Sequence, residues 1–342
     1  MRSDRPPGRA PGTARAVAAA LLAVVMTALL AGAPPAAGAA RTAVGADGGS
    51  SWSVRPAGTA DRAAFVMDSA PGTVVKDAVR ISNLSDAPLS FQVYGSDAYN
   101  TPRDGALAYR QAGEAQSGLG GWLSLDTNAL VIPPGRAADI PFTLNVPADA
   151  TPGSHVGGIV ALNNAVEQAG EAAGVDVGIQ RAIAVRIQLT VEGPLTPGLA
   201  VRSVRVHHLP AGAPFAGARA TLTYTVVNTG NAALRPTVSP RVSGLFGLRH
   251  SAFADRTLPL LLPGQSADLS ADWPDAPGVD YLTATVRVTA PGLPATTAQS
   301  SRVAVSWPTL GAVAGLLAVL AVALGRLRRD RSGATSRTGA VS

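Results

Sequence analysis

Most of the side chains that could bind a ligand fall in one stretch of the chain, residues 96–125. Its aromatic rings could stack on the faces of sugars, and its guanidinium groups could pair with the carboxylates of peptides. The candidate binding residues are Tyr99, Asn100, Arg103, Asp104, Tyr109, Arg110 and Trp122, together with His155 further along the chain. The alternative is that the aromatics pack against a core, which we favour for Trp122 because large aromatic residues are usually mostly buried.

Catalysis has weaker support than binding. His155 lies between Pro152-Gly153 and Gly157-Gly158, where a tight turn could enter a strand. No serine or paired carboxylate is clearly positioned beside it, so a half-packed turn residue is favoured over a catalytic base. The sequence has no nucleophile motif or phosphate-binding glycine loop, and we expect no enzyme. One route to an enzyme remains, a cleft that pairs two of the carboxylates of Asp97, Asp104 and Asp126.

Metal and cofactor sites are not expected. Asp97, Asn100 and Asp104 could supply oxygen ligands to Ca²⁺, but their spacing does not fit an EF-hand loop and such residues are common in turns. His207 and His208 are neighbours, and neighbours on a strand point to opposite faces. The chain has no cysteine, which removes thiol catalysis, iron–sulfur clusters and cysteine zinc sites.

The two ends of the chain are apolar and predict export and membrane anchoring. Residues 1–40 have a basic start, a short apolar run and small residues at the end, which is typical of a secretory signal peptide. An uncleaved signal anchor is the alternative. Residues 306–325 are long enough to span a membrane, with Trp307 at one interface and an arginine cluster after Gly325. We therefore expect a single-pass plasma-membrane protein with its N-terminus outside and its C-terminus in the cytoplasm.

The charge distribution argues against nucleic-acid binding. The chain has a formal net charge of +6, but between Arg41 and Arg302 it has 19 Lys and Arg against 20 Asp and Glu. The excess positive charge therefore lies at the ends, where it sets topology, and not in a basic patch on a folded domain. The bias toward arginine and alanine suggests a GC-rich, actinobacterial-type genome.

Short alternating segments separated by turns predict an all-β fold. The clearest strand is Ile183–Val191, in which apolar residues alternate with Arg186, Gln188 and Thr190. In the second half we expect strands at Leu199–Val206, Ala220–Val227, Leu258–Leu262, Ala267–Ala271, Tyr281–Val288 and Ser301–Val305. This pattern is typical of two tandem immunoglobulin-like β-sandwiches.

A weak internal repeat supports two copies of one fold. In each half a strand runs into an asparagine-led turn, which we expect to be a hairpin, at Asn83 and at Asn228. Later in each half a Pro-Gly turn, at Pro134-Gly135 and Pro263-Gly264, leads into an alternating strand. The first copy has extra chain at residues 96–125, which we expect to be an inserted loop of the kind that often carries binding surfaces.

Several short motifs in the first half resemble a known family. In order they are Trp52–Pro56, Pro71-Gly72, Val79–Pro88, Asp97–Asn100, Gly105–Tyr109, Trp122-Leu123, Pro134-Gly135 and Pro152–Ile159. Together they resemble the peptidoglycan-binding domain of WxL-interacting proteins, a domain of Gram-positive surface proteins. The resemblance implies an immunoglobulin-like fold, a cell-surface location and binding to cell-wall peptidoglycan. The second half does not match the family's partner-binding domain, so it does not imply a WxL partner.

These observations predict a non-catalytic cell-surface protein that binds peptidoglycan or another cell-wall component through its first sandwich. A membrane-anchored protein–protein interaction scaffold without affinity for glycans is the alternative, and its partner would be a surface protein. The predicted segments are the signal peptide 1–40, a flexible leader 41–50, the first sandwich 51–192, a linker 193–198, the second sandwich 199–305, the transmembrane helix 306–325 and a basic cytoplasmic tail 326–342.

Overall fold

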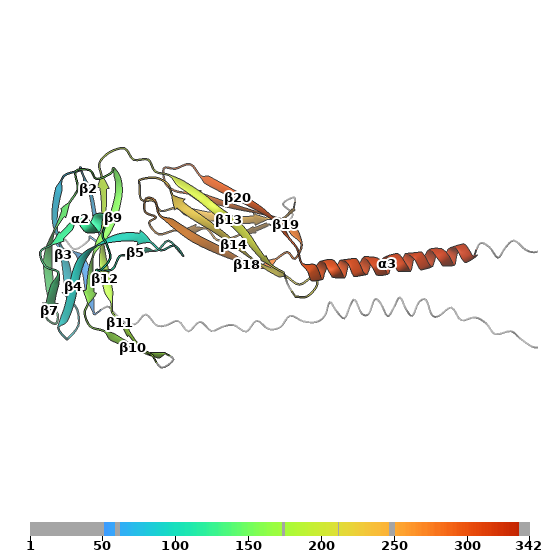
Figure 1. The fold of residues 1–342 in the computed structure, drawn as a ribbon, viewed down its shortest axis with the longest axis horizontal. Coiled ribbons are helices and arrows are strands. Elements are labelled where there is room, and N and C mark those ends of the chain that lie inside the picture. Colours follow the sequence, from blue (N-terminus) through green and yellow to red (C-terminus); the bar gives the residue numbers. More distant parts are fainter. Residues whose placement is uncertain (1–50, 59–61, 173–174, 211, 246–249, 335–342) are drawn as a thin grey trace, which may run out of the picture. The chain divides into compact units, whose positions relative to one another are not determined.

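The computed structural model describes residues 51–58, 62–172, 175–210, 212–245 and 250–334. The predicted signal peptide and leader lie outside the described residues. These described residues belong to one unit, which contains two all-β sandwiches and a long helix (Figure 1). The prediction of an all-β chain with tandem immunoglobulin-like sandwiches is confirmed.

The first sandwich consists of two sheets that enclose a core. One sheet has the strand order β1-β3-β8-β6, and the other has β2-β12-β9-β4, with β5 and β7 both paired to β4. A separate hairpin, β10–β11, connects β9 to β12. The strands are β1 Trp52–Pro56, β2 Phe65–Ser69, β3 Val74–Asn83, β4 Leu89–Asn100, β5 Leu107–Tyr109, β6 Leu123–Leu125, β7 Ala129–Ile132, β8 Ala137–Asn145, β9 Gly153–Asn163, β10 Glu167–Ala172, β11 Val175–Ile179 and β12 Ala182–Val191.

Alternation explains how these strands build the core. In β12 the apolar positions Val185, Ile187, Leu189 and Val191 are buried, whereas the intervening polar residues face outward. Aromatic side chains fill the space between the sheets: the rings of Trp52 and Phe91 lie 4.8 Å apart, and those of Phe65 and Phe142 lie 5.1 Å apart.

The second sandwich has its own core between the sheets β13-β14-β18 and β16-β15-β19-β20, with β17 also paired to β15. The strands are β13 Leu199–Leu209, β14 Ala218–Asn228, β15 Thr237–Ser243, β16 His250–Ala252, β17 Arg256–Thr257, β18 Ser266–Ala276, β19 Asp280–Thr289 and β20 Thr296–Ala304. The predicted strand Leu258–Leu262 is wrong: it is a connecting segment with one isolated bridge, from Leu261 to Leu234. Its leucines are buried without forming a sheet, which is why their apolar run suggested a strand.

The prediction of asparagine-led hairpins is also wrong. Asn83 ends β3 in one sheet and the chain re-enters the other sheet at β4, so the turn crosses between layers. Asn228 occupies the same place between β14 and β15. A crossing between layers and a hairpin use the same turn residues, so the sequence alone did not separate them.

The two repeated asparagines bind equivalent groups. The Asn83 amide donates to the carbonyls of Ala87 and Ile132 at 2.8 and 2.9 Å, and its oxygen accepts from the backbone N–H of Ser85 at 2.9 Å. The Asn228 amide donates to the carbonyls of Ala232 and Leu261 at 2.8 and 2.9 Å, and its oxygen accepts from Gly230. Each asparagine thereby ties its own layer crossing to the segment that precedes the Pro-Gly turn. The glycines of those turns, Gly135 and Gly264, have φ of +62° and +72°.

The inserted segment is more ordered than a loop. Asp97–Asn100 form the end of β4, Leu107–Tyr109 form β5, and α2 spans Leu119–Trp122. A three-residue strand is too short to show alternation, which is why the segment was expected to be a loop.

One long helix, α3 (Trp307–Ala334), follows the second sandwich after only two residues. Its part from Trp307 to Arg326 is long and apolar enough to cross a membrane, and it is exposed along its length. In the described part of the chain it is the one helix with that character.

Candidate binding site

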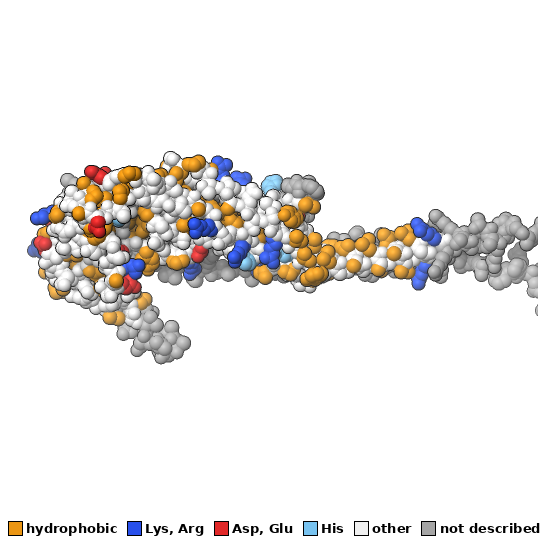
Figure 2. Space-filling model, turned by 45° about the horizontal axis from the view of Figure 1, so that its top comes forward, with side chains coloured by type: hydrophobic (Ala, Val, Ile, Leu, Met, Phe, Trp, Pro, Cys, Tyr) orange, Lys and Arg blue, Asp and Glu red, His pale blue; other side chains and the backbone are white. Residues whose placement is uncertain are grey.

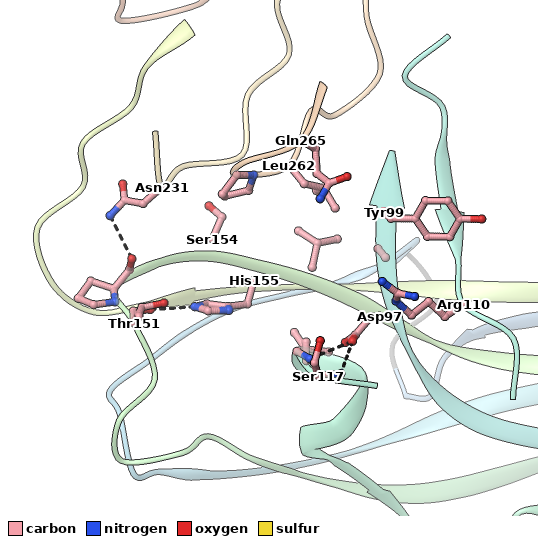
Figure 3. A pocket seen from close by; sticks show the side chains of 16 residues that line it. Asp97, Tyr99, Arg110, Ser117, Thr151, Ser154, His155, Asn231, Leu262 and Gln265 are labelled. Carbon is pink, nitrogen blue, oxygen red and sulfur yellow. Dashed lines mark hydrogen bonds between the residues drawn. The ribbon is translucent and has the colours of Figure 1, made fainter. Parts of the chain in front are cut away.

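A polar pocket of about 350 Å³ lies where the inserted segment meets the start of β9 and two turns of the second sandwich (Figure 3). Of the eight predicted binding residues, Tyr99, Arg110 and His155 line it. The second sandwich contributes Asn231, Leu262 and Gln265.

Asp97 organises one wall of the pocket. Its carboxylate accepts hydrogen bonds from the backbone N–H groups of Ser117 and Gly118 at 2.7 and 2.9 Å (Figure 3). It also accepts one from the N–H of Gly120 at 2.7 Å, and the Asp97 N–H donates to the Gln116 side chain. The side chain is mostly buried, and these bonds satisfy its charge. A Cβ on Gly120 would collide with the backbone of residues 96–97, so the approach requires glycine there. Asp97 is therefore a structural anion and not a free acid.

A pair of glycines in β9, Gly157 and Gly158, leaves room for side chains of the inserted segment. A Cβ on Gly157 would lie 2.8 Å from the Leu119 side chain, and one on Gly158 would lie 2.6 Å from the Tyr109 ring. Leu119 belongs to the buried core, while Tyr109 lies on the other face of the sheet. The Gly157-Gly158 pair thus allows α2 and β5 to pack closely on opposite faces of one strand.

His155 is fixed by its neighbours. Its Nε2 lies 2.8 Å from the carbonyl oxygen of Thr151, to which it must donate because a carbonyl only accepts. Its ring lies 4.8 Å from the ring of Trp122, which packs against the core. His155 is in β9 rather than in the turn before it, and its half-buried, stacked position agrees with a packed residue.

Arg110 brings a positive charge to the pocket. Its side chain is 44 % exposed, and its nearest carboxylate, Glu114, is 4.0 Å away. In Figure 3 its guanidinium points toward the other lining side chains, whereas the ring of Tyr99 points away from them. Among the described residues, the side chains of Ser154 and Gln265 also line the pocket and make no hydrogen bond within the chain. The pocket thus offers a cation, a hydroxyl and an amide to a ligand.

Two asparagines join the sandwiches beside this pocket. The Asn231 amide donates to the carbonyls of Pro152 and Pro194 at 3.0 and 2.9 Å, and its oxygen accepts from the Thr196 N–H at 2.7 Å. Asn100 is 3 % exposed; its amide donates to Leu260 O and its oxygen accepts from Leu262 N–H, both at 2.8 Å. The Asn100 side chain is therefore occupied by the joint and unavailable to a ligand.

The remaining predicted residues lie outside this pocket. Arg103 lines a separate hollow with Tyr224 and Asp268 of the second sandwich. The Asp104 carboxylate bonds to the Thr101 hydroxyl and to the Ala106 N–H, and the Thr101 hydrogen bond lowers the pKa of Asp104. These positions separate Arg103 and Asp104 from Arg110.

A second hollow of about 680 Å³ lies on the outer face of the sheet that contains β9 and β12. It is lined by Tyr94, Tyr109, Val160, Leu162, Ala182 and Ala184, among others. Burial raises the pKa of both tyrosines. The sequence analysis missed Tyr94, although a signal was present: it follows the inward-facing Val93, so its ring must face outward.

The arrangement supports neither a carboxylate pair nor a calcium site. The pocket is lined by only one of the three carboxylates considered, Asp97, and its oxygens accept backbone hydrogen bonds. Within the described ranges, no group of three or more His, Asp or Glu side chains could hold a metal ion. His207 is exposed, whereas His208 bonds to the Pro277 carbonyl at 3.0 Å.

No protein-family model and no curated protein sequence matches the chain. Solved structures with a similar fold include a chaperone–tip subunit complex of archaic chaperone-usher Csu pili from Acinetobacter baumannii, at 11 % identity and a TM-score of 0.34, covering 64 % of this chain and 89 % of that chain. The YadV chaperone matches at 8 % identity and a TM-score of 0.33, covering 74 % of this chain and 100 % of that chain. The Pseudomonas aeruginosa CupB2 chaperone matches at 11 % identity and a TM-score of 0.31, covering 70 % of this chain and 98 % of that chain.

Proposed function

We propose that this chain is a non-catalytic, membrane-tethered cell-surface protein that binds carboxylate-bearing cell-wall material in the pocket of Figure 3. The observation that carries the proposal is Arg110, a loosely paired guanidinium beside the free side chains of Ser154 and Gln265. A guanidinium with neighbouring donors suits a peptide carboxylate. The resemblance of the first sandwich to the peptidoglycan-binding domain of WxL-interacting proteins supports peptidoglycan as the source of that carboxylate.

The test is cosedimentation of the full chain, held in nanodiscs, with purified insoluble peptidoglycan. We expect the wild-type chain to sediment and the Arg110→Gln variant to bind about ten-fold more weakly, because a charged hydrogen bond contributes about 1.5–3 kcal/mol. Arg136→Gln removes an exposed arginine outside the pocket and serves as the matched control. Amidation of the free carboxyl groups of the wall should reduce binding to the level of the Arg110 variant. Equal sedimentation of all three chains, or none above a membrane-only blank, would contradict the proposal.

A protein-interaction scaffold is the second candidate, and the second hollow favours it. Tyr94, Tyr109 and Leu162 provide an aromatic and apolar surface that could accept a protein segment. Protease treatment of the wall preparation separates the two functions. Binding to the glycan-peptide mesh survives removal of the wall proteins, whereas binding to a surface protein is lost. If the partner is a protein, Tyr94→Ser should weaken binding to the untreated wall more than Arg110→Gln does.

A further inference from the structure

The exposed hydrophobic residues of the second sandwich gather at one end. All large hydrophobic side chains that are exposed in its described part lie at or near the ends of strands beside the start of α3, and they are Leu209, Phe215, Leu245, Val279, Tyr281 and Val303. Figure 2 shows hydrophobic side chains gathered where α3 leaves the sandwich. We call Leu209, Phe215, Leu245 and Val279 the collar; their exposed fractions are 65, 70, 48 and 47 %.

Hydrogen bonds fix this end of the sandwich to the first turn of α3. Ser306 is fully buried; its carbonyl accepts from the Leu310 N–H at 3.0 Å, and its hydroxyl accepts from Thr309 Oγ1 at 3.1 Å. The Phe215 N–H in turn donates to Thr309 Oγ1 at 3.1 Å. The loop that carries Phe215 is therefore attached to the helix itself, within one turn of its start.

The length of the helix fixes the depth of that attachment. The apolar part of α3, Trp307–Arg326, has 20 residues, which at 1.5 Å per residue span about 30 Å, the thickness of the hydrocarbon core. No apolar turn is left over, so a membrane-spanning α3 must place Trp307 at the interface. Phe215, bonded to Thr309, then lies at the same depth as the interface.

The backbone at the collar holds its apolar side chains exposed. Phe215 has φ of +59°, a left-handed conformation that is unfavourable for a bulky residue, and its ring is nevertheless exposed. Phe215, Leu245, Val279 and Thr309 line one hollow of about 370 Å³. The Asp280 carboxylate beside it accepts from the Leu245 and Tyr281 N–H groups at 2.9 and 2.7 Å, so its charge is engaged with the backbone.

The charge of the second sandwich is complementary to an anionic membrane surface. Residues 199–306 contain nine arginines, five aspartates and no lysine or glutamate, a net charge of +4. Residues 51–198 contain nine basic and fourteen acidic residues, a net charge of −5. Basic residues near a bilayer that contains anionic lipids are attracted to it, whereas the acidic first sandwich is repelled.

We propose that the collar binds the interfacial region of a phospholipid bilayer, so that the second sandwich sits on the membrane surface instead of hanging from α3. This inference rests on α3 crossing the membrane and is independent of the cell-wall ligand. Apolar and aromatic side chains at the headgroup level, continuous with Trp307 of the helix, are the chemistry that recognises this region.

The absence of cysteine in the chain makes the test direct. The variants Phe215→Cys and Val279→Cys are each labelled with an environment-sensitive fluorophore in the full chain, in nanodiscs of phosphatidylcholine with about 30 % phosphatidylglycerol. Ala295→Cys, exposed at the opposite end of the sandwich, is the matched control. We expect lipids with a quencher near the headgroup to reduce fluorescence several-fold more at positions 215 and 279 than at 295.

Each alternative outcome has its own reading. Equal quenching at 215, 279 and 295 would overturn the proposal, as would energy transfer between labels on two copies without lipid quenching, which would make the collar a self-association surface. If carbonate extracts the wild-type chain from native membranes, α3 does not span the bilayer. The proposal, which rests on a membrane-spanning α3, is then overturned as well. None of these results bears on whether the wall sediments the chain.

Discussion

At the scale of single residues, the candidate site depends on an anion that is not used for chemistry. The Asp97 carboxylate accepts hydrogen bonds from three backbone N–H groups in residues 117–120, and these bonds hold α2 and the pocket wall in place. In the sequence, the closeness of Asp97 to Asn100 and Asp104 suggested a calcium ligand or one member of a carboxylate pair. The structure instead makes it a substitute for the missing cap of a short helix, because Gly118 has no side chain to offer.

Replacement of this anion should weaken the fold. We expect Asp97→Asn to lower the free energy of unfolding by about 1.5–3 kcal/mol, because hydrogen bonds to a buried charge are lost and the amide nitrogen faces N–H donors. Urea unfolding followed by tryptophan fluorescence measures the change, since Trp122 belongs to the same helix. Asp86→Asn, at an exposed turn, should leave the stability within about 0.5 kcal/mol of wild type. Equal stability of the two variants would show that Asp97 does not hold the segment.

At the scale of elements, the repeated asparagines act as locks between layers. Asn83 and Asn228 are 1 % and 0 % exposed, and each satisfies carbonyl groups on two segments that cross from one sheet to the other. In a β-sandwich the chain has to pass from one sheet to the other without leaving buried polar backbone groups unpaired. One buried amide at each crossing solves that problem in both copies of the fold.

Removal of either lock should destabilise its own sandwich. We expect Asn83→Ala and Asn228→Ala each to cost about 2–3 kcal/mol, because the carbonyls of Ile132 and Leu261 lose a buried donor. Hydrogen exchange measured by mass spectrometry localises the loss, which should be largest at the layer crossing that each asparagine ties, around Asn83 and Ile132 for the first variant and around Asn228 and Leu261 for the second, because each crossing opens locally before the joined sandwiches unfold together. Asn145→Ala, at an exposed position of β8, is the control. Loss of protection spread evenly over both sandwiches would contradict independent locks.

Local patterns predicted the strands well but their connections poorly. The alternation of Ile183–Val191 was sufficient to identify β12, because a half-buried strand leaves a period of two in its residues. The repeat at Asn83 and Asn228 correctly indicated two copies of one fold. Whether those turns join neighbours or cross between sheets depends on contacts of Asn83 with Ile132, which is 49 residues away. The partners of Asn100 are 160 and 162 residues away, so no local signal could reveal that it belongs to the joint.

At the scale of the whole molecule, the two sandwiches share a third small core. Val156, Leu260 and Leu262 are buried together, with Ala98, Leu107 and Ala233 packed around them. The bonds of Asn100 and Asn231 flank this cluster. Residues 193–198, predicted as a linker, are therefore accompanied by a direct contact between the domains that they connect.

This joint should couple the unfolding of the sandwiches. We expect the wild-type chain to unfold in one calorimetric transition and Asn100→Ala to unfold in two, because the variant leaves the carbonyl of Leu260 and the N–H of Leu262 unsatisfied in the interface. Asn128→Ala, at an exposed turn of the first sandwich, should retain the wild-type profile. Two transitions in the wild-type chain would show that the joint does not transmit stability.

The short passage from β20 to α3 has a consequence for how a protease could separate the second sandwich from the helix. Only Val305 and Ser306 separate Ala304 from Trp307, and Ser306 is fully buried. Proteases that shed surface proteins cut extended, exposed chain, and such cleavage sites are concentrated in loops and stalks. A passage this short and buried offers a protease no extended chain until β20 detaches, so cleavage that separates the second sandwich from α3 at this passage requires β20 to unfold first.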